Sequence, residues 1–147
     1  MLERLTCDEY WTTQVLTATP QKLQLMLIDA ALRHCRRAAD DYAHGEFIAG
    51  GEPLLKAQEI FTEIMSAARQ GADQNPLGRR IVGLYNFLFR QLVIAHVQHD
   101  AEKIATVMDI LEIERETWQQ LCEKLGTDTM GTATTDQLAS SGYSFQA

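Results

Sequence analysis

The feature that most constrains this chain is a helix near its N-terminus whose start is well defined and whose apolar surface is wide. Thr19 is a good N-cap residue, and Pro20 suits the first helical position. At about 100° per residue, apolar side chains then cover two adjacent faces, comprising Leu23, Leu27, Ala30, Ala31 and Ala38 on one and Leu25, Ile28, Leu32, Cys35 and Ala39 on the other. An amphipathic surface helix needs only one apolar stripe. This helix is therefore buried on both sides, or it leaves part of a groove open for a partner.

Length, charge and cysteine content narrow the class of protein. The 147 residues suffice for one domain with its own core. A formal net charge of −7 and scattered basic residues argue against nucleic-acid binding. The three widely spaced cysteines, Cys7, Cys35 and Cys122, fit free thiols in a reducing compartment. No apolar run is long enough for membrane insertion, and the N-terminus does not read as a signal peptide. We therefore expect a cytoplasmic protein.

Gly, Pro and Asn residues divide the chain into four predicted helices, which cover residues 20–44, 52–70, 76–97 and 101–125. We expect Gly45 to end the first helix, residues 45–51 with Gly50 and Gly51 to form a loop, and Asp100 to cap the last helix, which Gly126 ends.

The last predicted helix repeats apolar residues every seven positions, with Arg115 as a charged interruption. Such a repeat is typical of long, nearly antiparallel packing. Four helices joined by short loops predict an all-α fold, an antiparallel up-down four-helix bundle over residues 20–125. Residues 1–19 would form a short N-terminal cap segment, and the polar residues 126–147 a flexible tail.

No arrangement of residues indicates catalysis. A carboxylate di-metal site in a bundle needs Glu-x-x-His pairs, and the sequence has none. The cysteines lack a paired base at a recognisable spacing, and Gly50-Gly51 is not part of a phosphate-binding loop. His96 and His99 have a spacing that could hold a metal, but a position near a helix C-terminus explains them more simply. We expect no enzyme activity, no metal and no cofactor.

Excess apolar surface favours a binding function instead. The third predicted helix is apolar nearly all round over residues 84–94, and Ile110 and Ile113 point away from the seam of the fourth helix. A large exposed apolar patch usually marks an interaction site, and a groove between helices suits an amphipathic partner helix. We predict a groove on the first and third helices lined by Leu23, Leu27, Leu84, Leu88, Leu92 and Val93.

Four short blocks of sequence carry a family resemblance. They comprise Tyr10, Gln14-Val15, residues 17–20, Lys22-Leu23 and residues 25–29; Lys56-Ala57-Gln58 with Ile60; Leu84-Tyr85-Asn86-Phe87 with Leu92 and Ala95; and Trp118 after Val107 and Leu111. In order and spacing, these blocks resemble the FliS family of flagellar export chaperones over about residues 10–124. The chain departs from the family pattern at residues 28–30 and at His96, where an Asn is common.

The resemblance implies a cytoplasmic chaperone that binds the C-terminal segment of newly made flagellin. Such a chaperone prevents premature polymerisation and aids delivery to the flagellar type III export apparatus. In the family, this N-terminal segment, called the leader here (residues 1–19), contains a tyrosine and is also linked to the export gate. Tyr10 is the matching position. The apolar leader residues would either cover the open groove until the client displaces them or pack on the end of the bundle.

Two other functions remain open from the sequence. A four-helix structural or regulatory module could use the same apolar faces to self-associate as a homodimer. A metal enzyme built on His96 and His99 is the more distant alternative.

Overall fold

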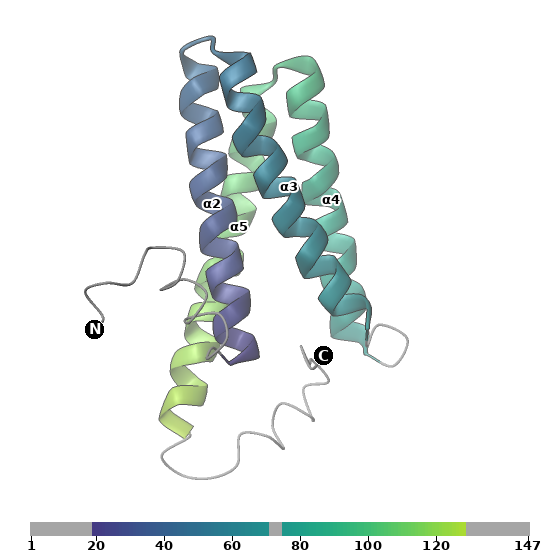
Figure 1. The fold of residues 1–147 in the computed structure, drawn as a ribbon. Coiled ribbons are helices and arrows are strands. Elements are labelled where there is room, and N and C mark those ends of the chain that lie inside the picture. The colour runs from purple at the N-terminus through teal and green to yellow at the C-terminus, as the bar shows by residue number, and fades with distance from the viewer. Residues whose placement is uncertain (1–18, 71–74, 129–147) are drawn as a thin grey trace, which may run out of the picture.

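A computed structural model describes residues 19–70 and 75–128, which form four α-helices (Figure 1). They are α2 (Pro20–Ala43), α3 (Phe47–Arg69), α4 (Pro76–Gln98) and α5 (Ala101–Asp128), and no strand occurs within the described ranges. The predicted all-α, up-down four-helix bundle is confirmed. The leader and most of the predicted tail lie outside the described residues. No helix in the described ranges has the length and apolar character needed to cross a membrane.

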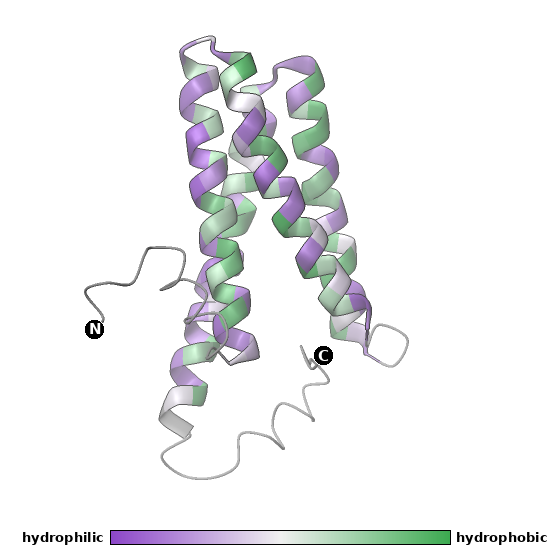
Figure 2. Cartoon of the chain, viewed as in Figure 1, coloured by the Kyte–Doolittle hydropathy of each residue, from purple (hydrophilic) through white to green (hydrophobic). Residues whose placement is uncertain are grey.

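The helices form a ring in which each packs against the next one and α5 packs against α2. Successive helices run in opposite directions, and α2 and α4 lie diagonally across the bundle (Figure 1). Among the four neighbouring pairs, α4 and α5 pack least closely. Hydrophobic and hydrophilic residues alternate along every helix, so that each contributes an apolar stripe to the interior (Figure 2).

Side-chain caps fix where three of the helices begin. The Thr19 hydroxyl accepts a hydrogen bond from the backbone N–H of Lys22 at 3.1 Å, and the Asp100 carboxylate accepts one from Glu102 at 3.0 Å. Asn75 caps α4 in the same way. Each cap satisfies a backbone donor that the helix itself leaves unpaired. The predicted caps at Thr19 and Asp100 are confirmed.

The predicted loop over residues 45–51 is wrong, because Gly50 and Gly51 lie within the first turns of α3. A Cβ atom at Gly50 would lie 2.7 Å from ring carbons of Tyr42 on α2, and one at Gly51 would lie 3.0 Å from Nε2 of His96 on α4. The two glycines therefore allow α3 to approach both neighbouring helices closely. The Gly50-Gly51 pair, which resembles a turn in the sequence, is instead needed for the close packing of helices.

Two other glycines behave differently from each other at helix ends. Gly45 has a φ of +71° just beyond the end of α2, as predicted for a residue that terminates a helix. Gly126 was expected to end the last helix, but α5 continues to Asp128. Within the described residues, Gly45 is the only glycine with a positive φ, so Gly126 keeps a conformation that the helix can continue through.

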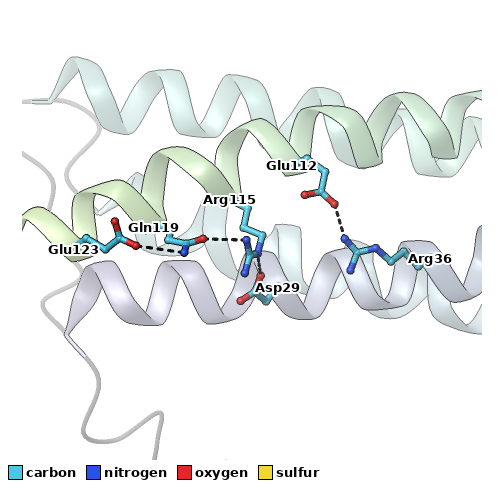
Figure 3. A network of polar contacts seen from close by, with 6 residues as sticks. All are labelled: Asp29, Arg36, Glu112, Arg115, Gln119 and Glu123. Carbon is cyan, nitrogen blue, oxygen red and sulfur yellow. Dashed lines mark hydrogen bonds and ion pairs between the residues drawn. The ribbon is translucent and has the colours of Figure 1, made fainter.

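The charged interruption in the heptad pattern is a contact between α5 and α2 (Figure 3). Arg115 donates from Nε to Oδ1 of Asp29 at 2.5 Å and from Nη1 to Gln119 at 3.0 Å. A second ion pair joins Arg36 to Glu112. Both pairs are partly exposed, so each contributes at most about 1 kcal/mol to stability. Their main effect is to align the two helices.

The core fills the space between the four helices. Its largest fully buried side chains are Tyr85, Phe61, Ile28, Leu32, Leu54, Ile64, Leu88, Leu92, Ile104, Leu111, Gln24 and Val107. The heptad positions of α5 contribute Ile104, Leu111 and Trp118, as the repeat predicts.

We expect Leu92→Ala to lower the free energy of unfolding by about 2–5 kcal/mol, because it leaves a cavity in a fully buried site. The matched control Leu55→Ala removes a side chain that is 52% exposed and should change stability by less than about 0.5 kcal/mol. Urea unfolding followed by circular dichroism measures both. Equal midpoints for the two variants would contradict the assignment of Leu92 to the core.

Candidate functional site

The predicted groove residues on α4 divide into buried and accessible positions. Leu88 and Leu92 are 0% exposed and belong to the core. Neither is accessible while the helices stay packed. The helices α2 and α4 are diagonal partners, and both contribute buried side chains to the same core. The sequence could not indicate this, since helical periodicity does not say which helices are neighbours.

The other predicted binding residues lie at the surface or near it. Leu23 and Leu27 on α2 are half-buried, and Leu27 packs against the core. Leu84 is half-buried, and Val93 is 38% exposed. Tyr10 lies outside the described residues. Leu23 and Leu27 thus lie on one helix of the bundle, and Leu84 and Val93 lie on its diagonal partner.

A cavity of about 530 Å³ lies between the first half of α4 and the second half of α5. Its lining residues are Leu77, Arg80, Ile81 and Leu84 from α4, and Ile113, Glu114, Thr117, Trp118 and Leu121 from α5. Most of these side chains are apolar. Leu84 is the predicted groove residue that lines it. The cavity opens between the two neighbouring helices that pack least closely.

On the α5 side, the cavity is lined by a buried tryptophan ring and by an exposed isoleucine at its rim. Trp118 is 6% exposed, whereas Ile113 is 67% exposed. The sequence pattern correctly placed Ile113 away from the core-facing seam, and Ile110 is half-buried against the core. An exposed isoleucine beside an apolar hollow provides surface that a partner could cover.

Two charged side chains face the cavity from opposite helices. Burial raises the pKa of Glu114, and the nearby Tyr85 hydroxyl and the positive charge of Arg80 partly offset that rise. Arg80 is exposed, and no carboxylate in the described ranges lies within ion-pair distance of it. The sequence did not indicate either residue as part of a site, because charged positions on a helix normally indicate a solvated face.

The histidines considered as metal ligands pack against other residues. The ring of His99 stacks on Phe47 with centroids 4.2 Å apart and an interplanar angle of 5°. Its φ of 54° forms the turn between α4 and α5. His96 lies against Gly51. In the part of the chain that the structure describes, no three His, Cys, Asp or Glu residues are grouped to hold a metal.

The cysteine environments disfavour the reactive thiolate. Burial raises the pKa of Cys35 to about 12 and also raises the pKa of Cys122. A thiol with a raised pKa is mostly protonated at neutral pH and is a poor nucleophile. Cys7 lies outside the described residues.

We expect Glu114→Gln to stabilise the protein at neutral pH. A carboxyl with a raised pKa in the folded state binds its proton more tightly there, so the wild type loses stability as the pH rises through that pKa. The advantage of the variant should disappear below the ordinary carboxyl pKa of 4.5. Thermal unfolding across this range measures it, with Glu63→Gln, at an exposed position on α3, as the control. An advantage that persisted in acid would contradict the burial of Glu114.

Comparisons with known proteins identify the family of this chain. The profile of the family described as "Flagellar protein FliS" matches residues 4–125. The flagellar secretion chaperone FliS of Bacillus subtilis is 29% identical over 122 residues, which cover 83% of this chain and 90% of that protein. The flagellar secretion chaperone FliS of Salmonella typhimurium is 30% identical over 110 residues, covering 75% and 82% respectively. The chain therefore belongs to the FliS family, in which these two relatives are flagellar secretion chaperones.

Proposed function

We propose that this protein is a secretion chaperone for flagellin and that the α4–α5 cavity receives an amphipathic helix from the C-terminal segment of flagellin. Family membership supports the client class. The observation that supports this location is the apolar cavity with its exposed rim at Ile113. Binding in the cytoplasm would keep the client from polymerising before it reaches the flagellar type III export apparatus.

The size of the cavity indicates how much of the client it would hold. A segment that folds on binding typically buries on the order of 1,000–3,000 Å². A cavity of about 530 Å³ accommodates only a few side chains, such as those at positions i, i+3 or i+4, and i+7 of a helix. We therefore propose that it anchors one helix of a longer client segment. The predicted binding residues Leu23, Leu27 and Val93 would then contact other parts of that segment.

We also propose a role for the leader, residues 1–19. Tyr10, which matches the family pattern, would contribute either to covering the client site or to contact with the export gate. Its contribution can be separated from stability by comparing client affinity and melting temperature in Tyr10→Ala.

Self-association is the second candidate function. Ile48, in the first turn of α3, and Val97, in the last turn of α4, are 97% and 77% exposed. The rings of Phe47 and His99 stack between these two helix ends. Exposed apolar residues at this end of the bundle favour a contact between copies. Analytical ultracentrifugation of wild type and Ile48→Asp distinguishes this function, because only a dimer through this surface would dissociate in the variant.

We expect Ile113→Asp to weaken binding of a flagellin C-terminal peptide by roughly tenfold or more, because it places a charge where the client helix would bury apolar surface. Both Ile113 and Ile48 are exposed, so neither change should prevent folding. Ile48→Asp is the matched control, since it makes the same substitution on α3 outside the cavity lining. Isothermal titration calorimetry measures both affinities.

The result also tests the location of the site. Equal loss of affinity in both variants, or unchanged affinity in Ile113→Asp, would place the client elsewhere. If the folded wild type did not bind the peptide, the proposed client would be wrong, and self-association would become the leading explanation of the apolar surface.

A further inference from the structure

We propose that Arg80 pairs with an acidic side chain on the bound helix and so fixes the register of that helix in the α4–α5 cavity. This inference rests on the proposed function, and it identifies the chemistry by which the site selects its partner. The observation behind it is a guanidinium group at the edge of an apolar cavity, with no ion-pair partner in the described part of the chain.

The two charged residues of the cavity differ in how well the protein itself satisfies them. The Tyr85 hydroxyl and the positive charge of Arg80 both lie close enough to the Glu114 carboxylate to lower its pKa. Arg80 and Glu114 nevertheless do not form an ion pair within 4.0 Å. Among the described residues, the planar guanidinium, which carries five N–H donors, therefore has no carboxylate partner that an incoming acceptor would have to displace.

Docking of a helix would change the cost of leaving Arg80 unpaired. In the free protein its charge is exposed to water, but a helix lying across the apolar walls would exclude part of that water. A desolvated charge without a partner is strongly unfavourable. A carboxylate on the incoming helix offsets this cost because it forms short, charge-assisted and often bidentate hydrogen bonds with arginine.

The negative net charge of the chain restricts the proposed acidic contact to the surroundings of Arg80. The chain carries a formal charge of −7, so its overall field repels an acidic segment. An acidic side chain on the partner is thus favourable near Arg80 and unfavourable at most other places on the surface. It would also be unfavourable beside Glu114, on the opposite wall of the same cavity.

This arrangement selects register as well as charge. The apolar walls accept any apolar side chain of suitable size, so a helix could slide along them by one turn with little penalty. Such a shift moves each side chain by about 5.4 Å, which takes a carboxylate out of hydrogen-bond range of Arg80. The partner helix is therefore expected to have an acidic residue at the edge of its apolar stripe.

The test compares Arg80→Glu with Arg79→Glu in the full chain, titrated with a flagellin C-terminal peptide. Both variants change the net charge equally, and both arginines are exposed, but only Arg80 lines the cavity. We expect Arg80→Glu to weaken binding tenfold or more and Arg79→Glu to weaken it less than threefold. Arg80→Gln, with a loss of intermediate size, separates loss of the pairing from new repulsion by Glu114.

Peptide variants identify the paired residue. Each acidic residue of the peptide is replaced by its amide in turn and titrated against wild type and Arg80→Gln. A double-mutant cycle should reveal one acidic position whose replacement weakens binding to wild type by at least fivefold but leaves binding to Arg80→Gln unchanged.

The outcomes separate this inference from the proposed function. If the folded wild type does not bind the peptide, both are wrong. If it binds, and Arg80→Glu and Arg79→Glu have equal affinities or no acidic position couples to Arg80, only the inference is overturned.

Discussion

The rest of the structure depends on one constraint, the burial of four apolar helix stripes in a single shared core. Each helix has two neighbours and one diagonal partner, and the stripes of all four helices contribute to the same core. Leu88 and Leu92 are buried in that core. Between neighbouring helices, apolar side chains remain accessible where the two helices do not close against each other. The α4–α5 pair, which packs least closely, has such an opening.

The polar contacts between α2 and α5 complement this arrangement (Figure 3). Arg115 and Asp29 replace an apolar contact in the heptad pattern, and Arg36 with Glu112 adds a second link. Ion pairs of this exposure contribute little to stability, but they favour one alignment of the helices over others. A close α2–α5 contact on one side of α5 leaves the cavity on its other side, toward α4. The helix α5 thus belongs both to the closely packed α2–α5 pair and to the candidate site.

Prediction from sequence succeeded where the signal is local. Thr19 and Asp100 cap helices through hydrogen bonds to residues two or three positions away, and Gly45 ends a helix through its own backbone angle. Prediction failed at Gly50 and Gly51, since their small size matters only because α2 and α4 lie against them. A pair of glycines has the same sequence signature in a loop and in a tight helix contact.

The candidate site shows the same difference between local features, which the sequence predicts, and contacts between helices, which it does not. Helical periodicity identified Ile113 as facing away from the core, and Leu84 as part of an apolar face. It could not bring them together, because they lie on different helices whose neighbours are decided by the whole bundle. Arg80 and Glu114 were missed because a charged residue acquires a special role only from the apolar walls around it.

By itself, therefore, the sequence determined the helical class of this protein, the starts of three of its four helices and the excess of apolar surface, since these follow from periodicity and from hydrogen bonds within a few residues. Only the tertiary structure decided which apolar faces meet in the core and which remain accessible. The physical reason is that burial is a property of neighbouring helices. The same leucine pattern leads to a core position on one side of α4 and to the wall of a cavity on the other.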